Sequence, residues 1–210
     1  MNSERFMYNE EDIIDIPPED IKIVENSSCF IDNGILYRYY DIDKTIKIPD
    51  GVTKIKKDAF NSKNNHKIKR INLPSTVTEI EDGTFSNLTS LEEINIPNGI
   101  TKIENNLFCN CRNLKKINLP DKVIKIGDNA FCCCFSLKEI NIPDSIEEIG
   151  ISAFFLCISL DEKIFNFSKR LKKIGENAFA HTKTRIAIFN NCEIGKDAFL
   201  ACKELIRKEI

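Results

Sequence analysis

Residues 114–134 read LKKINLPDKVIKIGDNAFCCC, and residues 137–157 repeat the phrase as LKEINIPDSIEEIGISAFFLC. Seven copies of this phrase occur, and the phenylalanine near the end of each falls at Phe60, Phe85, Phe108, Phe131, Phe154, Phe179 and Phe199. Neighbouring copies are therefore 20 to 25 residues apart. A period in this range predicts a solenoid, in which each unit buries its apolar face by stacking on its neighbours.

The first half of each copy alternates apolar and polar residues, as in Ile117-Asn118-Leu119. This alternation predicts a short strand that buries its branched residues and exposes the polar residue between them. Proline has no backbone donor for a sheet, so it ends the strand where it follows. It does so in five copies, at Pro49, Pro74, Pro97, Pro120 and Pro143.

The second half of each copy carries its own apolar pair, such as Val123 and Ile126, and then an Ala-Phe corner. We expect the phenylalanine rings of successive copies to stack into a continuous spine. Copies six and seven depart from the pattern, because residues 165–168 and 186–189 lack the proline. Copies one and five carry two extra residues each, which we expect to loop out of the stack.

The strand phrase L-x-x-I-x-I is similar to the consensus of leucine-rich repeats, and the continuation through proline, I-G-x-x-A-F and cysteine resembles the BspA-like subfamily. The resemblance covers residues 43–202. It implies an α/β-class leucine-rich-repeat solenoid, a right-handed curved coil of mostly strand and turn with a parallel sheet on its concave side. Members of the subfamily are surface adhesion and host-interaction proteins of bacteria and parasitic protists, and they share no catalytic residues.

The chain divides into three predicted segments: residues 1–42 with a capping hairpin, the solenoid at 43–202, and a C-terminal cap at 203–210. Asn33-Gly34 lies between two apolar runs, which predicts the hairpin within residues 30–40. The acidic segment 1–20 is expected to be partly disordered. Residues 203–210 are expected to form a short helix.

The charge balance and the absence of long apolar runs limit the partners. The 210 residues include 30 basic and 32 acidic side chains, for a net charge of −2, so neither nucleic acid nor an anionic membrane is an expected partner. No apolar run reaches the roughly 18–20 residues of a membrane helix. The first eleven residues do not resemble a secretory signal, so we expect a cytoplasmic protein, with the cell surface by a non-classical route as the alternative.

The nine cysteines have two interpretations. Five cluster within residues 109–134, and thiolates at such spacing are good zinc ligands. However, one cysteine lies three residues after the phenylalanine in four copies, at Cys111, Cys134, Cys157 and Cys202. This spacing favours a buried ladder of reduced, metal-free thiols. Cys109, Cys132 and Cys133 lie outside the ladder, and they are the thiols to watch for oxidation.

The sequence contains no recognisable catalytic or cofactor motif. His66 and His181 are its only histidines, and they belong to different copies. A glycine-rich phosphate loop and a metal-type carboxylate motif are both missing, so we expect no enzyme activity, cofactor or metal. A basic cluster spans Lys54–Arg70, and we favour a solvated loop there over a site for an acidic partner.

The outward residues of successive strands are the candidate binding residues. Their amides are expected to form a ladder, and their charges alternate in sign in a way that stabilises a sheet. The residues are Arg70, Asn72, Glu93, Asn95, Lys116, Asn118, Glu139 and Asn141. Two interpretations stay open: internal stabilisation, or a recognition surface.

The leading hypothesis is a non-enzymatic scaffold that binds a protein partner on the concave face of the solenoid. The alternative is a cell-surface adhesion protein of the BspA-like type. A homo-oligomer formed through the open edge strand is a further possibility.

Overall fold

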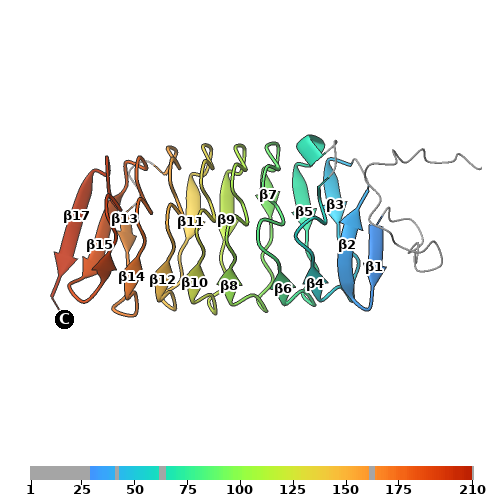
Figure 1. Cartoon of the computed structure of the whole chain (residues 1–210), viewed down its shortest axis with the longest axis horizontal. Helices are drawn as coiled ribbons and strands as arrows, with labels where there is room; N and C mark the ends of the chain where they lie inside the picture. Colours follow the sequence, from blue (N-terminus) through green and yellow to red (C-terminus); the bar gives the residue numbers. More distant parts are fainter. Residues whose placement is uncertain (1–28, 41–42, 62–64, 161–163, 210) are drawn as a thin grey trace, which may run out of the picture.

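The structure is a computed structural model that describes residues 29–40, 43–61, 65–160 and 164–209. The expectations for the acidic segment 1–20 and for most of the two insertions fall outside these ranges. The described residues form one stack of coils along the long axis of the molecule (Figure 1). The repeat period therefore predicted the architecture correctly.

Each coil contributes one short strand to the first of two rows (Figure 1). Five of these strands form a parallel sheet, namely β3 (Thr45–Lys47), β5 (Arg70–Asn72), β7 (Glu93–Ile94), β9 (Lys116–Asn118) and β11 (Glu139–Asn141). A second parallel sheet continues the row with β13 (Ile164–Asn166), β15 (Arg185–Phe189) and β17 (Glu204–Lys208). Copies six and seven thus pair in register, with Phe165 beside Ile186, although both lack the proline.

The second row consists of two-residue strands on the return half of each coil. The first coils contribute β4 (Lys54–Ile55) and β6 (Glu79–Ile80), and the later coils contribute β8 (Lys102–Ile103), β10 (Lys125–Ile126), β12 (Glu148–Ile149), β14 (Lys173–Ile174) and β16 (Glu193–Ile194). All of these strands are parallel to their neighbours. The 3-10 helix η3 (Asn65–Lys67) is the one helical element within the described ranges, so the solenoid is built of strand and turn.

The predicted hairpin is present at the N-terminal end of the stack. Strands β1 (Cys29–Asp32) and β2 (Ile35–Tyr39) pair antiparallel around Asn33 and Gly34, whose φ angles are 46° and 76°. These positive φ angles at both turn residues are those that a tight hairpin requires. Strand β2 then pairs in parallel with β4 and extends the second row.

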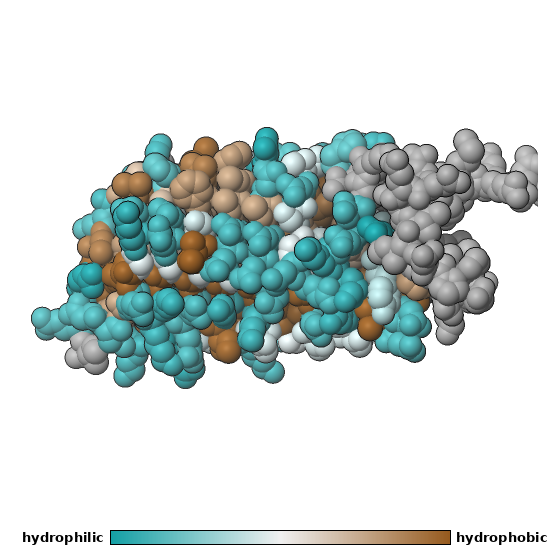
Figure 2. Space-filling view, in the orientation of Figure 1, coloured by the Kyte–Doolittle hydropathy of each residue, from teal (hydrophilic) through white to brown (hydrophobic). Residues whose placement is uncertain are grey.

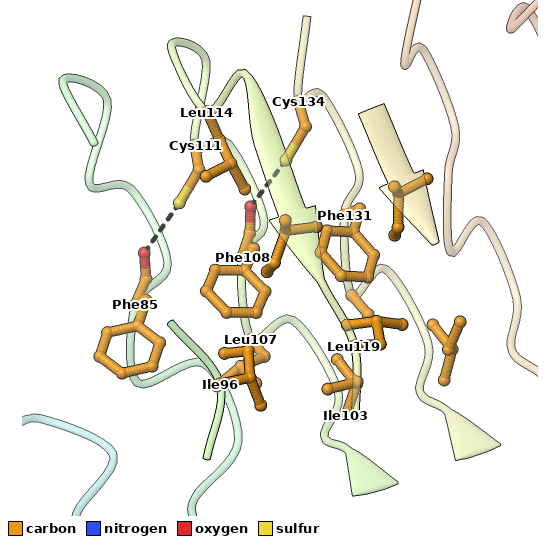
Figure 3. Close-up of a cluster of buried hydrophobic side chains, with 14 of the residues drawn as sticks. Phe85, Ile96, Ile103, Leu107, Phe108, Cys111, Leu114, Leu119, Phe131 and Cys134 are labelled. Carbon is orange, nitrogen blue, oxygen red and sulfur yellow. Dashed lines mark hydrogen bonds between the residues drawn. The ribbon is translucent and has the colours of Figure 1, made fainter. Parts of the chain in front are cut away.

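A spine of phenylalanine rings fills the interior of the coils (Figure 3). Phe85, Phe108, Phe131, Phe154 and Phe179 are completely buried. The centroids of successive rings from Phe60 to Phe179 lie 5.0 to 5.5 Å apart, and the ring of Phe199 lies 6.2 Å from that of Phe179. This spacing is within the range at which offset aromatic rings attract each other, so each ring stabilises the next coil.

The turns on either side of the phenylalanines from Phe85 to Phe199 use left-handed backbone. The residues two before and two after Phe108 are Asn106 and Asn110, with φ of 56° and 63°. The same two positions have positive φ in the coils of Phe85, Phe131, Phe154, Phe179 and Phe199. Backbone hydrogen bonds also join the coils there, as from the Phe108 amide to the Ala130 carbonyl at 2.8 Å. The turns thus satisfy their own polar groups by stacking.

The prediction of a C-terminal helix is wrong. Residues 204–208 instead form β17, which runs parallel to β15 with Leu205 beside Ile186. The reason is that the free edge of β15 offers a row of backbone donors and acceptors. An isolated helix of eight residues would be marginal by comparison.

Candidate partner-binding surface

The eight predicted binding residues lie together on the exposed face of one sheet. Here they are called the strand strip: Arg70 and Asn72 on β5, Glu93 on β7, Asn95 directly after it, Lys116 and Asn118 on β9, and Glu139 and Asn141 on β11. Parallel pairing in register aligns them in two rows. The charged row runs from Arg70 through Glu93 and Lys116 to Glu139.

Neighbouring side chains within the charged row of the strand strip form ion pairs with one another. The Arg70 Nε lies 3.2 Å from the Glu93 Oε2, and the Lys116 Nζ lies 2.7 Å from the Glu139 Oε2. All four side chains are more than half exposed. Such surface pairs typically contribute about 0.2–1 kcal/mol, so they order the row without contributing much stability.

The amide row does not form the expected ladder. The Asn95 Oδ1 accepts from the Leu73 amide, and its Nδ2 donates to the Leu73 carbonyl, both at 2.9 Å. Asn141 makes the same two bonds to Leu119, at 2.7 and 3.0 Å. Among the described residues, Asn72 and Asn118 make no side-chain hydrogen bond. Amides that bind the neighbouring backbone thus alternate with amides that face solvent.

A second row of charge lies beside the strand strip. Glu92 pairs with Lys69 at 2.9 Å and with Lys115 at 2.8 Å. Hydrogen bonds from Lys115 and Lys69 lower the pKa of Glu92 to about 2. The second strand row carries similar pairs, such as Lys125 with Glu148 at 3.1 Å. Cross-strand ion pairs are therefore a general feature of this solenoid and do not by themselves mark a binding site.

The basic cluster of residues 54–70 is partly neutralised by the next coil. Lys54 contacts Glu79 and Glu81, Lys56 contacts Glu81, and Lys69 and Arg70 contact Glu92 and Glu93. Burial would raise the pKa of Glu81, but hydrogen bonds from Lys56, the Lys57 amide and Lys54 lower it to about 2. This pairing favours the structural interpretation of the cluster.

Three of the four ladder cysteines are buried, Cys202 is only partly buried, and the ladder has a specific role in the coil. The thiols of Cys111, Cys134 and Cys157 donate to the carbonyls of the phenylalanines one coil earlier, at 3.0 to 3.2 Å. Figure 3 shows the bonds of Cys111 and Cys134. Cys202 does the same to Phe179 at 3.2 Å. Burial raises the pKa of the Cys111, Cys134 and Cys157 thiols, which keeps them protonated as donors.

The described ranges give little support to a metal site, a catalytic histidine or a membrane-spanning helix. They contain no group of three or more His, Cys, Asp and Glu side chains placed to hold a metal ion. His66 and His181 are both exposed, and the His181 ring packs edge-on against Phe155 with centroids 5.8 Å apart. In the same ranges, no helix has the length and apolarity that crossing a bilayer requires.

Sequence reasoning missed which polar groups serve the fold. Asn95 and Asn118 occupy the same position of the same motif, yet one binds backbone and the other faces solvent. The spacing of the ladder cysteines predicts their burial but not the hydrogen bonds that their thiols donate. The regular Phe-x-x-Cys spacing was the available signal, since it brings each thiol to the same backbone carbonyl.

The geometry of repeated strand, turn and phenylalanine spine agrees with the comparison to known families. The model of the BspA type Leucine rich repeat region, in six copies, matches residues 30–161 and 83–206. The chain belongs to the BspA-type leucine-rich repeat family. This family is generally a non-enzymatic repeat scaffold, and membership is consistent with a protein-interaction or a surface-protein role.

Solved structures support the BspA-type fold. The T. pallidum leucine rich repeat protein is 27% identical, with 80% of each chain covered and a TM-score of 0.70. A leucine-rich repeat protein from Eubacterium ventriosum is 21% identical, with 70% of this chain and 48% of that chain covered and a TM-score of 0.53, which shows the fold alone. No protein in the curated set matches the chain significantly.

Proposed function

We propose that this BspA-type protein is a non-enzymatic scaffold that binds a protein partner on the strand strip. The observation that supports this proposal is the exposure of two asparagines, Asn72 and Asn118. Within the described residues their amides make no hydrogen bond, whereas Asn95 and Asn141 are held by backbone. An exposed amide offers a partner one acceptor and two donors.

The strip favours a partner of mixed polarity. Its charges are already paired, so a partner need not supply a large net charge of either sign. Neighbouring strands lie about 4.8 Å apart, so the strip from β5 to β11 spans only roughly 14 Å. A standard interface buries about 800 Å² on each side, so the partner would also cover flanking residues of the first strand row.

Photo-crosslinking tests this proposal. A photoreactive phenylalanine analogue replaces Asn72 or Asn118, and a control protein carries it in place of Lys196, an exposed residue in a turn away from the strip. We expect both strip positions to capture the same protein, identified by mass spectrometry, and the control to miss it. Capture from Lys196 alone would place the site elsewhere and contradict the proposal.

Localisation stays a prediction. We favour the cytoplasm, with a role in surface adhesion as the alternative. Labelling of intact cells with an impermeant amine reagent distinguishes the two, because the many exposed lysines react only if the protein is outside. Strong labelling before lysis would favour the adhesion role.

A further inference from the structure

Three cysteines outside the buried ladder gather on the turns that follow the phenylalanines. Cys109 and Cys132 each follow their phenylalanine directly, in neighbouring coils, and Cys133 is the next residue. All three are free and half-buried. The same position is Ser86 in the coil before and Phe155 in the coil after. Figure 2 shows a patch of apolar side chains on the upper side of the molecule, over its middle and C-terminal coils.

The coil geometry favours a disulfide between Cys109 and Cys132 over one between Cys132 and Cys133. The Asn110 amide donates to the Cys132 carbonyl at 2.8 Å, so the two coils are hydrogen-bonded at this point. Hydrogen-bonded parallel segments lie about 4.8 Å apart, within the roughly 4.4–6.8 Å between Cα atoms that a disulfide requires. Cys132 and Cys133 have sulfurs only 3.6 Å apart. However, consecutive Cα atoms are about 3.8 Å apart, which is below that range.

The environment also activates one thiol of the pair. A hydrogen bond from Cys132 lowers the pKa of Cys109 to about 7, although burial opposes the shift. The same interaction and burial raise the pKa of Cys132. Near neutral pH Cys109 is thus substantially a thiolate, which is the nucleophilic form, and Cys132 holds a proton beside it.

We propose that Cys109 and Cys132 are a hydroperoxide-reactive thiol pair that closes a disulfide between neighbouring coils. The Cys109 thiolate attacks one peroxide oxygen, the O–O bond breaks, and the departing hydroxide takes a proton to leave as water. Cys109 becomes a sulfenic acid. The Cys132 sulfur then attacks the Cys109 sulfur, and the hydroxyl group leaves with the Cys132 proton as a second water. Two thiols are oxidised by two electrons, and one hydrogen peroxide is reduced to two waters.

The ladder cysteines serve as internal controls. Cys111, Cys134 and Cys157 are completely buried, and their thiols are engaged with phenylalanine carbonyls. Burial raises their pKa, so they hold little thiolate. They should stay reduced under conditions in which Cys109 and Cys132 oxidise.

Peptide mapping of the peroxide-treated full-length protein tests the proposal. The reduced, folded protein is treated with hydrogen peroxide at pH 7, alkylated and digested. We expect a peptide pair joined through Cys109 and Cys132 and the loss of two free thiols per chain. A disulfide at Cys132–Cys133, or retention of all thiols, would overturn the proposal even if no variant folds.

Three variants assign the roles of the thiols, after circular dichroism and melting temperature show that each is folded. Cys109→Ser should slow peroxide consumption about tenfold, because a thiol of pKa near 7 is about half ionised at pH 7 and an ordinary thiol only a few per cent. Cys132→Ser retains a donor hydroxyl and should accumulate a sulfenic acid at Cys109, trapped by a 1,3-diketone. Cys133→Ser is the matched control and should behave like the unmodified chain. An unchanged rate in Cys109→Ser would refute the assignment.

Discussion

At the scale of single residues, buried and exposed side chains of one coil contribute very differently to the free energy of unfolding. Phe131 is completely buried between the rings of Phe108 and Phe154, at 5.3 and 5.2 Å. Asn118, on the strand that leads into the same coil, faces solvent. The two residues therefore test the inside–outside assignment directly.

We expect Phe131→Ala to unfold or severely destabilise the solenoid and Asn118→Ala to leave it nearly unchanged. Loss of a buried phenylalanine typically costs about 3–5 kcal/mol, against the roughly 5–15 kcal/mol that stabilises a domain. An exposed amide should cost about 1 kcal/mol or less. Thermal and urea unfolding measure both effects. Equal losses in the two variants would mean that the assignment is wrong.

A second residue-scale prediction concerns left-handed backbone in the last coil. Ala201 has a φ of 61° and is exposed, so its side chain contributes strain and little packing. Ala201→Gly should stabilise the protein by roughly 0.5–1 kcal/mol, since relief of the strain outweighs the extra freedom of the unfolded chain. Ala198→Gly is the matched control, because Ala198 is buried and is not left-handed. If both changes destabilise the protein in urea titrations, strain at residue 201 is not significant.

At the scale of elements, the contact between coils limits which residues can follow the second strand. Gly150 lies directly after β12, and a Cβ atom there would lie 2.4 Å from the Asp128 Oδ1 and 2.6 Å from the Asp128 amide nitrogen. The Asp128 carboxylate is itself fixed, because it accepts from the Ile151 amide at 2.7 Å. Glycine here therefore permits the close approach of two backbones.

We expect Gly150→Ala to destabilise the solenoid by about 1–3 kcal/mol through this overlap. Gly99→Ala is the comparison, because its added carbon would meet the Thr78 side chain at 3.0 Å and the Val77 carbonyl oxygen at 3.3 Å, which are less severe overlaps. Melting temperatures of the two variants give the measurement. A larger loss at Gly99 would show that coil spacing is not set at Gly150.

Much of this element structure could be predicted from sequence because the repeat is local and regular. The period predicted the stack of coils, the I-x-I alternation predicted the strands, and Asn33-Gly34 predicted the hairpin. The strand β17 was missed because its pairing depends on the free edge of β15, which no local pattern in residues 203–210 reveals. The division between Asn95 and Asn118 was missed because it depends on the orientation of side chains that occupy the same position of the repeat.

At the scale of the whole molecule, ion pairs cross from coil to coil along the stack. Glu81 and Glu92 each bridge two lysines, and both have pKa values lowered to about 2 from an ordinary value of 4.5. A carboxyl whose pKa is lower in the folded than in the unfolded chain favours folding above its unfolded pKa. The contribution is lost as the pH falls through the folded value.

We therefore expect the melting temperature to fall as the pH decreases from about 4.5 to about 2. Glu92→Gln should lower the melting temperature slightly at pH 7 and flatten its decline in acid, since the amide cannot titrate. Scans across this pH range at low ionic strength provide the measurement, with Glu104→Gln as a control outside these bridges. An unchanged pH profile in Glu92→Gln would show that the bridge does not stabilise the fold.

The central proposal, recognition through the strand strip, is tested most directly by inverting its charged row. Arg70→Glu, Glu93→Lys, Lys116→Glu and Glu139→Lys together preserve the alternation of sign, so the internal ion pairs and the fold should survive. The control inverts one pair of the second strand row, Lys125→Glu with Glu148→Lys.

The measurement is the dissociation constant for the partner captured by crosslinking, by calorimetry on proteins of equal melting temperature. We predict that inverting the strip weakens binding at least tenfold, because a partner complementary to the original row then meets like charges. The control should bind unchanged. Unaltered affinity after inversion of the strip, with loss in the control, would contradict the proposal.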